Sequence, residues 1–176
     1  MAIIESVRAE FLYYKALGER AIAQLDGAGL SASPPGGGNS IATICWHVSG
    51  NLRSRFTDFL TTDGEKPWRK RDEEFEVRAV TRDELLEKWE QGWSVLLGAL
   101  DSLTDGDLER TVTIRNQPSA VREALLRSLA HVSYHVGQIV YAAKAARGDE
   151  WRYLSIPPGG SEQHNQQLAS ERQGRR

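Results

Sequence analysis

Apolar residues recur every three or four positions along four long stretches of the chain. These stretches cover residues 2–26, 40–61, about 81–102 and 118 to about 147. In the second stretch the apolar positions are Ile41, Ile44, Val48, Leu52, Phe56 and Phe59. Because an α-helix repeats about every 3.6 residues, this spacing predicts four amphipathic helices that each turn one side toward a common core.

Three of these helices carry recognisable start signals. Asn39 or Ser40 is placed to cap the second helix, since either side chain can accept a hydrogen bond from a free backbone N–H of the first turn. Thr81 and Glu84 form the capping-box pattern before the third helix. Pro118 is expected to open the fourth helix, because proline is favoured at the first helical position.

The connections between the helices are rich in glycine, proline and charge. Residues 27–39 and 62–80 are expected to be irregular, and the segment 65–76 (EKPWRKRDEEFE) mixes both charge signs, as a solvated loop does. Alternating apolar residues in 110–117 predict an extended segment. Gly148 is placed to end the fourth helix, since glycine readily adopts the backbone conformation found after a helix C-terminus.

Four amphipathic helices with little strand signal predict an all-α fold, namely a four-helix bundle. The loops after the first and second helices are longer than short up-and-down connections need, so we expect at least one long crossover connection. The chain of 176 residues suits one domain with its own core. We expect a single helical-bundle domain over residues 1–166, irregular beyond the fourth helix, and a flexible tail over residues 167–176.

Composition and charge exclude several classes of protein. The chain is 40% apolar and 26% charged, with a net charge of −2, which gives no reason to expect nucleic acid or an anionic membrane as a partner. No apolar run approaches the ~20 residues of a membrane span, and the N-terminus lacks a signal-peptide pattern. The single cysteine, Cys45, excludes an internal disulfide. We therefore expect a cytoplasmic protein that acts on a small molecule.

Three of the four histidines fall on predicted helices and form the candidate site. His131 and His135 are four residues apart, so both lie on one side of the fourth helix, at the edge of its apolar stripe. His47 lies at the edge of the apolar stripe of the second helix. If the two helices face each other, three imidazoles can hold one divalent ion and leave a coordination position open for water or substrate.

The spacing of the histidines by itself leaves alternatives open. The HVSYH sequence of His131 and His135 lacks the glutamate of the HExxH motif, which argues against a peptidase. Two histidines at the edge of a core can also be hydrogen-bonded packing residues that bind no metal. Imidazole ligands suit zinc, nickel, iron and copper, so the ligand type leaves the ion open.

Several neighbours of the histidines are candidates for supporting roles. Asn51 and Gln138 lie one turn beyond His47 and His135, where each could contact the substrate or hydrogen-bond a metal ligand, and ordinary packing is the alternative. Arg55 continues the His47 stripe and could bind a substrate carboxylate or form a salt bridge. The helical angle places Tyr134 away from the histidines, as a packing residue. No general base is recognisable.

Three segments of the chain resemble the DinB/YfiT-like superfamily of metal-dependent proteins. They are SIATICWHVSGNLRSRFTDFLTTDGEKPWRKRDEEFE, SLAHVSYHVGQIVYAAK and YLSIPPGGSEQHN, and the resemblance extends over about residues 3–166. It is nearest to a bacterial branch with the FLTTDGEKPWR loop. The resemblance implies a four-helix bundle with a crossover connection, with His47, His131 and His135 as the ligands of one divalent metal ion.

The same resemblance suggests a reaction class. Related members are thiol-dependent S-transferases and an isomerase, which implies a low-molecular-weight thiol as cosubstrate. The resemblance also implies a homodimer. Zinc or nickel is the metal we expect, with iron or manganese as alternatives. A metal-dependent hydrolase and a non-enzymatic metal- or ligand-binding bundle remain as alternative functions. Of these three, the thiol-dependent transferase is the leading hypothesis.

Overall fold

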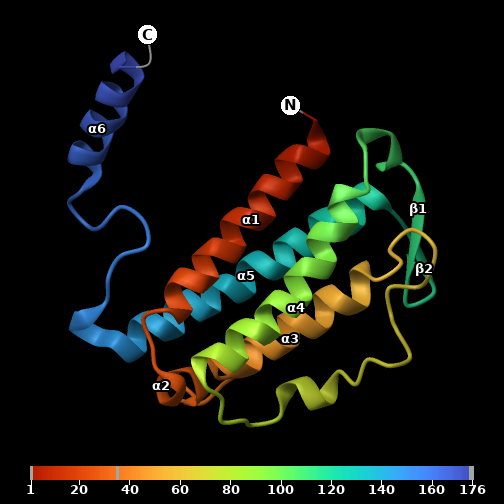
Figure 1. The fold of residues 1–176 in the computed structure, drawn as a ribbon, viewed down its shortest axis with the longest axis horizontal. Helices are drawn as coiled ribbons and strands as arrows, with labels where there is room; N and C mark the ends of the chain where they lie inside the picture. The colour runs from red at the N-terminus through yellow and green to blue at the C-terminus, as the bar shows by residue number, and fades with distance from the viewer. Residues whose placement is uncertain (1, 35, 175–176) are drawn as a thin grey trace.

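The computed structural model describes residues 2–34 and 36–174 and is built around four long helices. These are α1 (Ile3–Ile22), α3 (Ile41–Phe56), α4 (Arg82–Asp101) and α5 (Val121–Arg147). Figure 1 shows the four helices lying side by side, with α3 packed most extensively against α4, and α1 against α5. The predicted all-α bundle is confirmed.

The remaining elements are short or lie at the ends of the bundle. They are α2 (Gly27–Ser31), η1 (Asp72–Phe75), η2 (Asp105–Asp107), β1 (Thr111–Ile114), β2 (Gln117–Ala120), η3 (Gly148–Glu150) and α6 (Ser161–Gly174). Two of the stretches that the sequence predicts to be irregular therefore contain a helical turn, α2 in 27–39 and η1 in 62–80. None of the helices in the described ranges is long and apolar enough to cross a membrane.

The connection between α3 and α4 is the predicted crossover. Figure 1 shows α3 and α4 running in the same direction, while residues 57–81 pass along the outside of the bundle and return the chain to its other end. This connection carries η1, which packs against α3. The crossover therefore lays a charged loop over the helix that carries His47.

Large side chains fill the space between the helices. Trp89 and Trp93 of α4 are fully buried with ring centroids 5.3 Å apart, and Phe11 of α1 meets Trp93 edge-on. Truncating such a residue to alanine typically costs roughly 3–5 kcal/mol. Gly92 lets α4 approach α3 closely, since an added Cβ would lie 2.6 Å from the Cα of Ser49. This packing fixes the position of α3, on which one side of the candidate site is built.

The helix ends confirm most of the predicted signals. The Ser40 hydroxyl accepts a hydrogen bond from the backbone N–H of Thr43 at 3.1 Å and caps α3. Thr81 and Glu84 form the expected reciprocal capping box at the start of α4. Gly148 follows the last residue of α5 with a φ of 56°, a conformation that favours glycine.

Two predicted helix boundaries are wrong. Pro118 does not open a helix but pairs with Thr113 in a hairpin of β1 and β2, and α5 begins only at Val121. The chain reverses at Arg115 and Asn116, whose φ values of 54° and 59° form a turn suited to a two-residue hairpin. The second predicted helix ends at residue 56 rather than 61.

The chain after α5 differs from the irregular segment that the sequence predicts. Residues 161–174 form α6, an almost entirely exposed helix that Figure 1 shows lying apart from the bundle. Residues 175 and 176 of the tail predicted at 167–176 lie outside the described residues. The division of the chain at residue 166 stays a prediction.

Candidate metal centre

Three histidine side chains converge between α3 and α5. His47 comes from α3, and His131 and His135 come from successive turns of α5. One ring nitrogen of each histidine lies within 4.8 Å of the others. Nε2 of His47 and Nε2 of His131 are 3.3 Å apart, close to the roughly 3.4 Å expected between two nitrogens bound tetrahedrally to one zinc ion. The cluster could therefore hold a metal ion.

Hydrogen bonds to the other ring nitrogens set the tautomers of two of these imidazoles. Nδ1 of His47 donates to the carboxylate of Glu74 at 2.9 Å, which leaves Nε2 with its lone pair facing the cluster. Nδ1 of His135 donates to the side-chain oxygen of Gln138 at 2.8 Å. Nε2 of His135 is buried and has no hydrogen-bond partner among the described atoms. Histidines that bind metals are commonly oriented in this way, by a donor hydrogen bond from the second ring nitrogen.

Glu74 is held in place by Arg69 as well as by His47. The Arg69 guanidinium donates to both carboxylate oxygens, at 2.8 and 2.9 Å, and the two side chains are only 2% and 9% exposed. Burial opposes ionisation, but the hydrogen bonds from Arg69 and His47 outweigh it and lower the pKa of Glu74. Gly50 leaves room for this carboxylate, because an added Cβ would lie 2.7 Å from Cδ of Glu74.

Burial keeps the two histidines of α5 in the neutral form that metal ligation requires. Loss of solvent, together with the neighbouring histidines, lowers the pKa of His131 to about 3. Burial likewise lowers the pKa of His135 to about 4, although its hydrogen bond with Gln138 opposes the shift. Three imidazole ligands suit a divalent ion, and three protein ligands leave a fourth position for another molecule.

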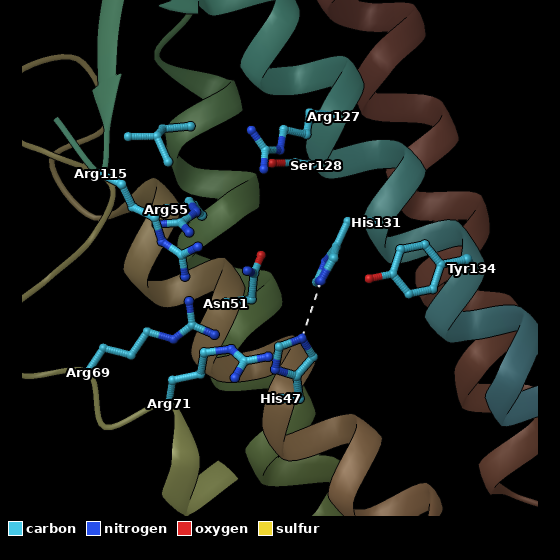
Figure 2. A pocket seen from close by; sticks show the side chains of 11 residues that line it. His47, Asn51, Arg55, Arg69, Arg71, Arg115, Arg127, Ser128, His131 and Tyr134 are labelled. Carbon is cyan, nitrogen blue, oxygen red and sulfur yellow. Dashed lines mark hydrogen bonds between the residues drawn. The ribbon is translucent and has the colours of Figure 1, made fainter. Parts of the chain in front are cut away.

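A cavity of about 190 Å³ opens beside His47 and His131. Figure 2 shows His47 and Asn51 on one side of it, and Ser128, His131 and Tyr134 from α5 on the other. The cavity is also lined by Arg55, Arg69, Arg71, Arg115 and Arg127. No aspartate or glutamate is among the described residues that line it. A molecule bound in the cavity would therefore meet both the histidine cluster and a concentration of positive charge.

The structure places the predicted supporting residues around the cluster in different ways. Asn51 lines the cavity, and Gln138 hydrogen-bonds His135 from outside it. Arg55 lines the cavity and also forms a salt bridge with Glu65 at 3.2 Å. Roles for these three residues in binding substrate or supporting the metal ligands remain predictions.

The sequence predicts Tyr134 to be a packing residue. Tyr134 is instead half exposed and lines the cavity, with its ring centroid 5.1 Å from that of His131. The angle between neighbouring helical positions underestimates the reach of a tyrosine ring, which bends back over the helix surface. Cys45 is fully buried, and burial raises the pKa of its thiol well above the ordinary value.

The expectation that residues 65–76 form a solvated loop is wrong for its central residues. Glu74 is 7% exposed, because η1 packs on α3 and brings the Glu74 side chain to His47. The Arg69 side chain is buried against Glu74. Glu74 lies 27 residues from His47, and no local pattern joins them. Gly50, one turn after His47 inside a helix, was the available signal, since such a glycine can mark a close approach by another segment.

The fold and the histidine cluster define the class, a four-helix-bundle protein with a candidate metal centre. The family described as "Protein of unknown function (DUF1572)" matches residues 1–160, and the chain belongs to this family. It is also similar to a solved structure described as a conserved protein from Enterococcus faecalis. That similarity covers 85% of this chain and 99% of the other at 17% identity and a TM-score of 0.65, which shows a shared fold. No curated protein matches the chain.

These comparisons leave the finer expectations open. Neither names the DinB/YfiT-like superfamily, so that resemblance stays a prediction. The expected homodimer, cytoplasmic location and particular metal also stay predictions.

Proposed function

We propose that the protein is a metalloenzyme that holds one divalent ion, zinc or nickel, through His47, His131 and His135 and binds a low-molecular-weight thiol at the open position. The observation that carries the proposal is the convergence of one ring nitrogen from each histidine within 4.8 Å, beside a cavity. When bound, such an ion lowers the pKa of a coordinated thiol and makes the thiolate available near neutral pH. The thiol proton would pass to solvent, and the thiolate sulfur would then bond to an electrophilic carbon of a small molecule in the cavity, whose leaving group would depart with its bonding electron pair.

The lining of the cavity favours a thiol over water as the activated group. A thiol loses its proton outright on coordination, so the protein need not supply a base. Metallopeptidases that activate water commonly use a glutamate beside the metal. Glu74 is unsuited to that role, because both of its oxygens are occupied by Arg69 and one also by His47.

The chain's own residues would orient the metal ligands and contact the bound molecules. Glu74 and Gln138 fix the rings of His47 and His135 through their Nδ1 atoms. Asn51 and Ser128 offer polar groups to the bound molecules from opposite walls of the cavity. The mixture of fixed imidazoles and short polar side chains is suited to holding two small reactants together.

Metal analysis of protein purified without a histidine tag tests the first part of the proposal. We expect about one ion per chain, lost in His131→Ala and retained in His164→Ala, which removes a histidine on α6 far from the cluster. Absence of metal after incubation with zinc, nickel and iron would refute the metal centre.

The thiol is tested on the cobalt-substituted protein. Cysteine and glutathione should change its visible absorption spectrum through sulfur ligation, whereas serine, which replaces the sulfur of cysteine by oxygen, should not. A spectrum that no thiol changes would refute the thiol-dependent reaction and favour hydrolysis or simple metal binding.

A further inference from the structure

The arginines around the cavity come from separate parts of the chain. Arg55 lies on α3, Arg69 and Arg71 on the loop leading to η1, Arg115 in the turn of the β-hairpin and Arg127 on α5. Bringing like charges together is unfavourable unless something compensates for their repulsion. The fold nevertheless collects them beside the histidines, which indicates that the positive charge has a use there.

Carboxylates of the protein neutralise only part of this charge. Glu74 pairs with Arg69, and a single carboxylate, Glu65, is shared between Arg55 at 3.2 Å and Arg115 at 2.8 Å. Burial lowers the pKa of Arg55. The positive charges of Arg69 and Arg115 also lower this pKa, whereas the pairing with Glu65 raises it by a smaller amount. The inner part of the cavity thus holds more guanidinium than carboxylate charge.

Arg71 and Arg127 carry the least compensated charges. Among the described residues Arg71 forms an ion pair only with Asp72, at 3.6 Å, and the Asp72 side chain is fully exposed to solvent. The Arg71 guanidinium also lies over the ring of Phe75 at 4.9 Å. Arg127 forms no ion pair with any residue that the structure describes. Figure 2 shows the two side chains on opposite sides of the cavity, Arg71 beside His47 and Arg127 on α5, the helix that also carries His131.

The turn that carries Arg115 is anchored rather than loose. The carboxylate of Asp63 accepts hydrogen bonds from the backbone N–H groups of Arg115 and Asn116, at 2.9 and 2.8 Å. The backbone N–H of Gly64 donates to the carbonyl of Thr113 at 2.8 Å and ties the same loop to the hairpin. The part of the positive wall that Arg115 forms is therefore preorganised, which lowers the cost of binding an anion there.

We propose that the electrophilic substrate is a small dianion bearing carboxylate or phosphate groups, bound between Arg71 and Arg127 with its reacting carbon directed at the histidine cluster. This inference rests on the proposed function for the direction of the reacting end, but the anion site itself does not require a metal. Guanidinium groups bind carboxylate and phosphate through paired hydrogen bonds, so either anion suits the site. The volume of the cavity, about 190 Å³, suits a compact molecule.

Calorimetric titration of the full chain tests the anion site, with succinate as the dicarboxylate probe, glycerol phosphate as the phosphate probe and succinamide as the neutral match for succinate. We expect binding of one or both anions, weakened by salt, and none of the diamide. The relative affinities of the two anions decide between a dicarboxylate and a phosphorylated substrate. Equal binding of succinate and succinamide, or no binding of either anion at millimolar concentration, would overturn the inference.

Two variants locate the site. Arg127→Gln and Arg71→Gln should each lower the affinity for the anion by roughly tenfold to a hundredfold, which is the loss expected for one charged hydrogen-bonding partner. Arg122→Gln is the matched control, since Arg122 also lies on α5 but pairs with Glu109 outside the cavity. Equal affinity in Arg122→Gln and Arg127→Gln would refute the site, because only the net charge would then matter.

The metal content of the same samples separates this inference from the proposed function. Both arginine variants should still bind one ion, because neither residue contacts a histidine nitrogen through any hydrogen bond of the described chain. Anion binding by a protein that takes up no metal would support the anion site and refute the metal centre. Metal uptake without anion binding would support the metal centre and refute the anion site.

Discussion

Replacing Gly50 with alanine adds one methyl group to α3 at the point where the Glu74 carboxylate lies. The new Cβ would be 2.7 Å from Cδ of Glu74, so the carboxylate must move. The glutamate side chain is flexible, but its oxygens are held by Arg69 and His47. Any movement that relieves the overlap therefore breaks hydrogen bonds that orient His47.

The expected magnitude follows from these contacts. Loss of a group that orients a metal-binding histidine typically lowers the affinity for the metal by about 10–100-fold, and we expect a change of that size in Gly50→Ala. The better helix propensity of alanine contributes about 1 kcal/mol of stability. A broken charged hydrogen bond costs about 1.5–3 kcal/mol, so the metal-free variant should be destabilised by about 0.5–2 kcal/mol overall.

Competition with a coloured chelator measures the affinity, and urea unfolding of the metal-free protein measures the stability. Gly98→Ala is the matched control, because Gly98 lies inside α4 and an added Cβ there meets nothing within 4 Å. The free energy of unfolding of this control should rise by about 0.4–1 kcal/mol, and its affinity for metal should be unchanged. If Gly50→Ala behaves like Gly98→Ala in both assays, the carboxylate of Glu74 does not position His47.

Three further predictions test the surroundings of the site. The metal-free protein should lose stability as the pH falls from 6.5 toward 4. In this range the unfolded chain binds protons on His131 and His135, whereas the folded chain does not, because folding lowers their pKa values to about 3 and 4. Urea unfolding across this range measures the change, and a free energy of unfolding that rises as the pH falls would contradict the prediction. Gln138→Ala should weaken metal binding by about tenfold, measured by chelator competition, through loss of the hydrogen bond to His135, whereas Gln138→Glu should keep the bond and the affinity. Cys45 should react with a thiol reagent only after unfolding, since it is fully buried with a raised pKa; rapid labelling of the native protein would show that α3 opens locally.

The sequence by itself determined the features of this protein that depend on neighbouring residues. Apolar spacing located the four long helices, and the Ser40 cap, the Thr81–Glu84 capping box and Gly148 located several of their ends. The pairing of His131 with His135 was also local, because positions four apart always share one side of a helix. Each of these features is set within one or two helical turns, so the pattern alone carries the information.

The tertiary structure decided which distant residues meet. His47 reaches His131 across 84 residues because α3 and α5 pack together, and Glu74 reaches His47 because the crossover lays η1 on α3. The hairpin turn took Pro118 out of the predicted helix, since Arg115 and Asn116 adopt positive φ values that side-chain periodicity does not reveal. The arginines of the cavity come from separate segments whose contacts depend on the paths of the connections. Such contacts gain their energy from packing and charge pairing between elements, which no local pattern encodes.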